Sequence, residues 1–154
     1  MKLRLPHELV RKLMTALQRA GRREIGGQLF GKQLAVSEFE VTELAIQKRH
    51  GTIARFAVDL FQATRDAMRF FARTSHSYRQ FNYIGEWHSH PSFAVMPSAQ
   101  DIATMRDLAR DPKFKGTFAV LMIVRADGAT LNAGAWVFDP QGRESSIELE
   151  LADE

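Results

Sequence analysis

The chain has 154 residues, of which 45% are hydrophobic and 25% charged, a size and mixture typical of one globular domain. It contains no cysteine, which excludes disulfides, iron–sulfur clusters, thiolate zinc sites and a cysteine nucleophile. No apolar run reaches the roughly 20 residues of a membrane helix, and the N-terminus has no signal-peptide pattern. We therefore expect a single cytoplasmic domain over residues 1–154, with no membrane partner.

The net charge of +3 is unevenly distributed along the chain. Residues 1–25 contain seven basic and two acidic side chains, a net charge of +5, whereas residues 143–154 contain one basic and five acidic ones, a net charge of −4. A protein that binds single-stranded nucleic acid usually presents a basic stripe interleaved with aromatic side chains. The dipolar pattern instead indicates solvated charged faces, and we expect no nucleic-acid partner.

The spacing of apolar residues predicts helices and strands that alternate along the chain. In chain order they are a helix between Pro6 and Gly21, strands over 28–36 and 39–46, a helix over 59–74, a strand over 81–88, a helix over 98–110, and strands over 118–124, 131–138 and 144–151. Loops are expected over 47–55 and 90–97. This order predicts an α/β domain with a mixed β-sheet and helices packed on it.

The segment over residues 84–101, IGEWHSHPSFAVMPSAQD, contains residue types that bind metals. His88 and His90 are two residues apart at the end of a predicted strand, so their side chains face the same side. Asp101 falls in the first turn of the next predicted helix and can return its carboxylate to the same point. Two imidazole nitrogens and one carboxylate oxygen are three of the four ligands of a tetrahedral zinc site. A water in the fourth position would make this a catalytic site, because zinc lowers the pKa of its water to roughly 7.

Two further polar residues complete a hydrolytic set. Glu24 lies just before Gly26 and Gly27, where a carboxylate can be held at the entry to the sheet, and it is the candidate general base for the water. Ser98 is the candidate hydroxyl donor to the oxyanion of a tetrahedral intermediate.

Each of these residues also has a purely structural interpretation. Two histidines separated by one residue occur by chance, Ser98 and Asp101 fit a capping box, and Glu24 extends a surface charge cluster with Arg22 and Arg23. The joint pattern favours the catalytic interpretation, and capping is compatible with it because a helix start orients both groups.

The combined pattern resembles the JAMM metalloprotease family, also called MPN+ or JAB. Its signature is an upstream Glu, then H-x-H, ten residues and Asp, commonly with Pro after the second His and Ser three residues before the Asp. Here residues 91–100 supply the ten positions, Pro91 and Ser98 are in place, and the stretch REIGGQLFG over 23–31 is similar to the strand that carries the family's catalytic Glu. The resemblance implies a single MPN domain of the cytidine-deaminase-like type.

The resemblance also implies roles for individual residues. His88, His90 and Asp101 would bind one zinc ion per chain, Glu24 would be the general base and Ser98 the oxyanion donor. Members of the family hydrolyse the bond after the C-terminal glycine of ubiquitin-like proteins, in conjugates or precursors. Others process sulfur-carrier proteins, and some are non-catalytic scaffolds.

This chain looks like the compact prokaryotic branch of the family. The run FNYIGEWHSHPS is similar to peptidases encoded beside ubiquitin-like, E1-like and E2-like proteins in bacterial antiphage operons. The expected partners are therefore a ubiquitin-like protein with a glycine tail, its conjugates and those operon proteins.

The loop over 92–96 and the segment over 47–56 are the expected walls of a substrate channel. Phe93, Val95 and Met96 are apolar residues in a loop, and we assign Phe93 and Met96 to substrate binding. The alternative is that they cover the core beneath the loop. Trp87 points to the strand face opposite His88, so we expect it in the core.

Overall fold

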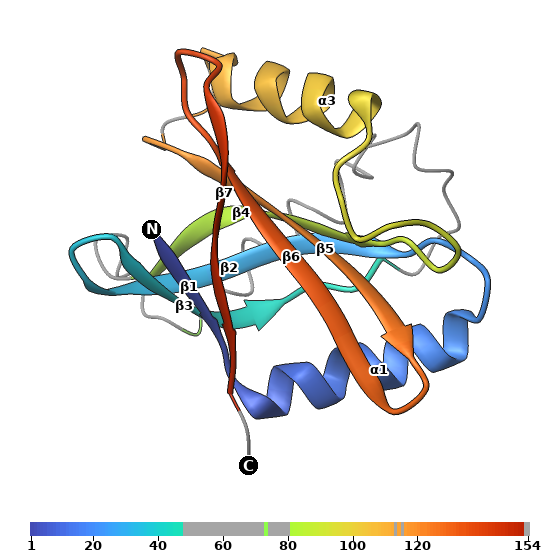
Figure 1. Cartoon of the computed structure of the whole chain (residues 1–154). Helices are drawn as coiled ribbons and strands as arrows, with labels where there is room; N and C mark the ends of the chain where they lie inside the picture. The colour runs from blue at the N-terminus through green and yellow to red at the C-terminus, as the bar shows by residue number, and fades with distance from the viewer. Residues whose placement is uncertain (48–72, 74–80, 113, 115, 153–154) are drawn as a thin grey trace.

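The computed structural model describes residues 1–47, 73, 81–112, 114 and 116–152 (Figure 1). Its elements in chain order are β1 (Lys2–Leu5), α1 (His7–Ala20), β2 (Gly26–Ala35), β3 (Glu38–Leu44), β4 (Phe81–Ser89), α3 (Ala99–Arg110), β5 (Ala119–Asp127), β6 (Thr130–Phe138) and β7 (Glu144–Leu151). The predicted helix over 59–74 and most of the predicted loop over 47–55 lie outside the described residues. None of the described helices has the length and apolar character needed to cross a membrane.

The strands form one mixed sheet that closes into a barrel in the order β1-β3-β2-β4-β5-β6-β7. β1 runs parallel to both β3 and β7, and β4 runs parallel to β5, whereas the remaining neighbours are antiparallel. α1 and α3 lie on different sides of the strands (Figure 1). The predicted mixed sheet with packed helices is therefore confirmed, and the structure adds that the sheet closes on itself.

The ends of both described helices follow from their flanking residues. α1 begins after Pro6 and ends before Gly21, which adopts φ 62° and donates its backbone N–H to the carbonyl of Leu17. α3 begins after Ser98, as predicted, because the Ser98 hydroxyl accepts the backbone N–H of Asp101.

The first strand is an element that the sequence analysis missed. The predicted order of elements starts with the helix after Pro6. In the structure β1 precedes this helix and closes the barrel between β3 and β7. Leu3 and Leu5 are buried and alternate with the charged Lys2 and Arg4, which is the period of a strand. Four residues are too short for this period to stand out, and the strand forms because distant segments pair with both of its edges.

The parallel pairing of β1 with β7 explains the dipolar charge pattern. It places the basic N-terminal segment beside the acidic C-terminal one. Lys2 Nζ lies 3.6 Å from Glu148 Oε1 and also pairs with Glu150, and Arg4 Nε lies 3.4 Å from another oxygen of Glu150. Exposed pairs of this kind add little stability. They do mean that part of the basic segment is neutralised within the fold.

β5 is the centre of the hydrophobic packing because both of its faces are buried. Alternate residues Val120, Met122 and Val124 join a cluster with α1 and the barrel interior. The intervening residues of β5 pack with the buried face of α3 in a second cluster, formed by Ala119, Leu121, Ile123, Met105, Ala109 and Phe138. Trp87 belongs to the first cluster and is fully buried, as predicted. His88, the next residue of β4, therefore faces the side where α3 packs.

Candidate metal centre

The close pairing of β2 with β4 sets the position of His88. Gly26 lies opposite His88 in this antiparallel pair. A Cβ atom at Gly26 would lie 3.0 Å from His88 Cβ and 2.5 Å from the Trp87 carbonyl oxygen. Only glycine allows the two strands to approach this closely, so Gly26 has a steric role beside the imidazole of His88.

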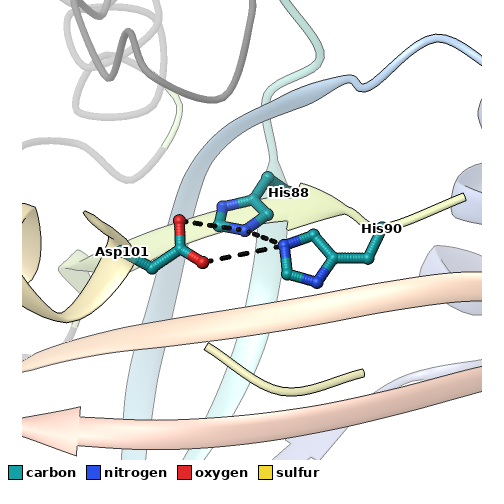
Figure 2. A group of neighbouring side chains, drawn as sticks. All are labelled: His88, His90 and Asp101. Carbon is teal, nitrogen blue, oxygen red and sulfur yellow. Dashed lines mark hydrogen bonds and ion pairs between the residues drawn. The ribbon is translucent and has the colours of Figure 1, made fainter. Parts of the chain in front are cut away.

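His90 continues the extended direction of β4 by one residue beyond its end. Its backbone N–H donates to the carbonyl of Val124 in β5, at 2.9 Å. Two residues of extended chain bring the imidazoles of His88 and His90 to the same side, with ring centroids 4.8 Å apart and Nε2 atoms 3.0 Å apart (Figure 2). The predicted convergence of the two rings is present.

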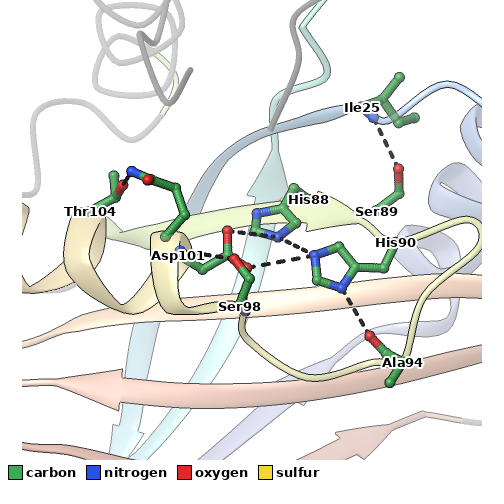
Figure 3. Close-up of polar contacts among 9 residues, drawn as sticks. Ile25, His88, Ser89, His90, Ala94, Ser98, Asp101 and Thr104 are labelled. Carbon is green, nitrogen blue, oxygen red and sulfur yellow. Dashed lines mark hydrogen bonds and ion pairs between the residues drawn. The ribbon is translucent and has the colours of Figure 1, made fainter. Parts of the chain in front are cut away.

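Asp101 reaches the same point from the first turn of α3. Its carboxylate Oδ2 accepts the backbone N–H of Ser98 at 2.7 Å, and its own N–H donates to the Ser98 hydroxyl at 3.1 Å (Figure 3). This capping box fixes the side chain toward the histidines. Oδ1 lies 3.5 Å from His88 Nε2, and Oδ2 lies 3.7 Å from His90 Nε2. The same orientation of the Asp101 side chain thus forms the predicted capping box and suits its predicted role as a ligand.

The electrostatics of this group favour an ionised carboxylate beside the rings. Burial acts to raise the pKa of the Asp101 carboxyl, but the neighbouring imidazole of His88 and the backbone amide of Ser98 outweigh it and lower that pKa to about 2. Both histidines and Asp101 are buried, and Asp101 Oδ1 makes no regular hydrogen bond to any described residue. The site therefore holds an ionised carboxylate, and its two oxygens face the ring nitrogens of His88 and His90.

The donor set fits a zinc ion. Two donors bound at about 2.0–2.1 Å in a tetrahedral arrangement lie roughly 3.3 Å apart. The observed donor separations are 3.0 Å between the ring nitrogens and 3.5 and 3.7 Å from the carboxylate to the rings. One ligand atom from each of His88, His90 and Asp101 lies within 4.8 Å of the others. Metal binding by these residues remains a prediction, and the geometry is compatible with it.

A backbone carbonyl selects the tautomer of His90. Its Nδ1 lies 2.9 Å from the carbonyl oxygen of Ala94 (Figure 3). A carbonyl accepts only, so Nδ1 carries the proton and the Nε2 lone pair faces the other two ligands. Histidines that bind metals are commonly held in this way by a partner on the second nitrogen.

Glu24 is not part of the ligand group, and it precedes a residue whose backbone pairs with the end of β4. The next residue, Ile25, donates its N–H to the Ser89 hydroxyl at 3.0 Å, and its carbonyl accepts the Ser89 N–H at 2.8 Å. This pairing holds the backbone of Glu24 against the end of β4, and its side chain is half-buried. In the part of the chain that the structure describes, the ligand group contains His88, His90 and Asp101 but not Glu24. This placement suits a base that is not a ligand, and that role remains a prediction.

The three other residues to which the sequence assigns a role, Ser98, Phe93 and Met96, are exposed in the structure. Ser98 is exposed, and because its oxygen accepts a bond from Asp101, its own hydroxyl proton is still available to donate. Phe93 is 59% exposed and Met96 is 63% exposed. The alternative, in which the apolar loop residues cover the core, is therefore wrong for Phe93 and Met96 and confirmed for Val95, which packs on the cluster beneath α3. Their contact with substrate remains a prediction.

Two buried polar residues on the same strand face were missed. Glu86 precedes His88 by two residues, and Gln28 lies directly opposite Glu86 in the pairing of β2 with β4. Burial raises the pKa of Glu86 to about 8, and a 2.7 Å hydrogen bond from the Tyr83 hydroxyl offsets part of that effect. Neither polar atom of the Gln28 amide has a hydrogen-bond partner among the described residues. The strand period could have found Glu86, because it lies two residues before His88, whereas the position of Gln28 depends on the pairing of β2 with β4.

The comparison with family models identifies the chain. The model described as prokaryotic homologs of the JAB domain matches residues 6–139, a range that includes every position of the motif. The chain belongs to this family. No curated protein matches it.

The comparison with solved structures finds a similar fold in DSY2949. The solution structure of protein DSY2949 from Desulfitobacterium hafniense has a TM-score of 0.64 and 18% sequence identity, and the match covers 99% of this chain and 94% of that one. AF2198, a JAB1/MPN domain protein from Archaeoglobus fulgidus, gives a TM-score of 0.49 at 17% identity and covers 96% of this chain and 97% of its own. The predicted MPN/JAB identity is confirmed by the family match, whereas the similarity to antiphage operon peptidases stays a prediction.

Proposed function

We propose that this JAB domain is a zinc-dependent peptidase that hydrolyses the bond after the C-terminal glycine of a ubiquitin-like protein, in an isopeptide conjugate or a precursor. JAB domains are often metal-dependent isopeptidases. The observation that carries the proposal is the convergence of His88, His90 and Asp101, three buried side chains from a strand end and a helix start. A purely structural capping box explains Asp101 alone, but not two imidazoles directed at the same carboxylate.

Each residue of the site has a defined task in this proposal. A bound zinc ion supplies Lewis acidity, which makes a water molecule nucleophilic near neutral pH and polarises the scissile carbonyl. Glu24, held against the end of β4, accepts the proton of that water and delivers it to the leaving amine. The hydroxyl of Ser98, an exposed residue, donates to the carbonyl oxygen as negative charge develops on it.

The burial of the ligand side chains favours a slim substrate segment. The ligand side chains are buried, while Phe93 and Met96 expose apolar surface on the adjoining loop. A glycine tail can reach a buried centre because it carries no side chains, and apolar loop residues can flank it. A ubiquitin-like protein therefore suits the site as substrate. E1-like and E2-like proteins of the same operon are the further partners that we propose.

The test uses purified zinc-loaded protein and three matched substrates built on one ubiquitin-like protein that ends in two glycines. They are a linear fusion to a reporter, an isopeptide-linked lysine adduct and the same fusion with both glycines replaced by alanine. We expect cleavage of the first or second, loss of cleavage on chelation, recovery on adding Zn²⁺, and no cleavage of the alanine fusion.

A sulfur-carrier precursor serves as a fourth substrate, because the same chemistry acts on its glycine tail. Preference for that precursor over the ubiquitin-like substrates would replace the proposed substrate. Failure to cleave any of them with zinc bound would leave a non-catalytic scaffold as the function.

A further inference from the structure

An arginine on β5 contacts the loop that follows the two histidines. The Arg125 guanidinium donates from Nη1 to the carbonyl oxygen of Phe93, at 2.8 Å. Its other two nitrogens bind the carboxylate of Asp127 in a two-point contact, Nε to Oδ1 at 2.8 Å and Nη2 to Oδ2 at 2.9 Å. Asn132 of the neighbouring strand also donates to Asp127 Oδ2, at 3.3 Å. The arginine is thus held by its own strand while it holds the loop.

Two residues of β5 form hydrogen bonds with this loop. The carbonyl of Val124 accepts the backbone N–H of His90, and the next residue, Arg125, binds the carbonyl of Phe93. Between these points the loop turns back on itself, because the N–H of Phe93 contacts the carbonyl of His90 at 3.4 Å. The residue after Phe93 is Ala94, whose carbonyl accepts the His90 Nδ1 proton. A short chain of contacts therefore connects Arg125 to the orientation of the His90 ring.

The same contact places the aromatic ring of the loop. The Phe93 ring meets the His90 ring edge to face, with centroids 6.1 Å apart, although Phe93 is largely exposed. In the part of the chain that the structure describes, the bond from Arg125 to the Phe93 carbonyl is therefore one of the contacts that keep this exposed ring beside the imidazole.

We propose that Arg125 is a positioning residue of this site. By holding the Phe93 carbonyl it fixes residues 91–97, and through that loop it keeps the His90 ring in its ligand orientation and Phe93 beside the path of the substrate. The proposal rests on the metal site of the proposed function. Arg125 acts through the loop and not by touching the metal or the reacting atoms.

The geometry of the contact requires arginine. A guanidinium presents N–H groups on all three nitrogens in a fixed plane, so it can bind a carboxylate at two points and a carbonyl with the third nitrogen. A lysine ammonium keeps the charge but has a single nitrogen, which cannot reproduce the three-point contact. The Arg125→Lys variant therefore separates charge from geometry.

The test compares Arg125→Ala, Arg125→Lys and Asp127→Asn with the matched control Arg143→Ala. Arg143 also pairs with an aspartate, Nε to Asp139 Oδ2 at 2.6 Å, but in the turn between β6 and β7. The first measurement is zinc affinity by competition with a chromophoric chelator. The second is the rate of chymotrypsin cleavage after Phe93 in metal-free protein, followed by mass spectrometry. Neither measurement needs peptidase activity.

We expect Arg125→Ala to weaken zinc binding about tenfold, the lower end of the effect of removing groups that support metal ligands. We also expect cleavage after Phe93 to accelerate about tenfold, because the loop opens more often. Arg125→Lys should recover at most part of either loss. Asp127→Asn should shift both in the same direction by a smaller factor, and Arg143→Ala should match wild type.

Wild-type zinc affinity and cleavage rate in Arg125→Ala would overturn the proposal, and so would full recovery in Arg125→Lys or an equal effect in Arg143→Ala. Should Arg125→Ala fail to fold, Asp127→Asn decides by the same two measurements. A chain that shows these shifts but cleaves no ubiquitin-like fusion would refute the proposed function and leave the positioning role of Arg125 standing.

Discussion

Gln28 and Glu86 lie directly opposite each other in the pairing of β2 with β4, and both side chains are buried. They lie one step along the strands from the pair formed by Gly26 and His88, on the same face. Burial raises the pKa of Glu86 to about 8, so its carboxyl keeps its proton at neutral pH. At neutral pH the buried carboxylate of Asp101 is then negatively charged, whereas the buried carboxyl of Glu86 is neutral.

This arrangement predicts a distinctive pH dependence in metal-free protein. The pKa of Glu86 is 4.5 when exposed and about 8 when folded, so between these values the unfolded chain loses a proton that the native chain keeps. The contribution of Glu86 to the free energy of unfolding should therefore be largest below about pH 4.5. It should decrease as the pH rises toward 8, by on the order of a few kcal/mol. Glu86→Gln, which still accepts the Tyr83 hydroxyl, should lose this decrease.

Urea denaturation at several pH values between 5 and 9, with a chelator present, provides the measurement. The difference between wild type and Glu86→Gln isolates this group, because every other titrating side chain is common to both proteins. Parallel stability curves for the two proteins would show that Glu86 is not protonated in the fold.

The second prediction concerns the metal itself. Protein purified without chelator should contain close to one equivalent of zinc by elemental analysis, bound by His88, His90 and Asp101. His88→Ala should lose it, because two remaining ligands do not make a zinc site. His7→Ala is the matched control, since His7 lies at the start of α1 and outside the ligand group. Stoichiometric zinc in the double variant of His88 and His90 would rule out this site.

The sequence predicted the ligand group well because each of its members obeys a local rule. Two residues of extended chain align the histidines, and a capping box directs Asp101, so neither needed knowledge of distant contacts. β1 could not be predicted in this way, because its pairing depends on β3 and β7. Arg125 was missed for the same reason, since its partner Phe93 lies 32 residues away in the chain. The sequence therefore predicts residues that act within a segment better than those that act between segments.

The third prediction concerns the exposed loop residues. Replacing both Phe93 and Met96 by serine should raise KM for the full ubiquitin-like substrate several-fold and leave the melting temperature within a few degrees of wild type. Both side chains are mostly exposed, so their removal leaves no core cavity, whereas losing buried side chains of this size costs about 2–5 kcal/mol each. Val36→Ser is the matched control, because Val36 is 89% exposed after the far end of β2. A melting temperature lowered by more than about 10 °C would assign the two residues to stability instead.

The last prediction separates the base from the ligands. Glu24→Gln should keep its zinc, its fold and its affinity for substrate, because Glu24 is outside the ligand group. Turnover should fall about 10²–10⁴-fold, since an amide does not accept the proton of the attacking water. Asp101→Asn should behave differently and bind zinc more weakly, because it replaces the ionised ligand that the structure places beside both rings.

An inactive enzyme with an intact site should also retain its substrate. Immobilised zinc-loaded Glu24→Gln should capture a ubiquitin-like conjugate or precursor with a glycine-containing junction, and Glu24→Gln that also carries the His88→Ala change should not, because it lacks the metal. Mass spectrometry of the captured protein identifies the junction. Wild-type turnover in Glu24→Gln, or loss of its zinc, would mean that Glu24 is not the base, and the hydrolytic role of the group formed by His88, His90 and Asp101 would need another proton acceptor.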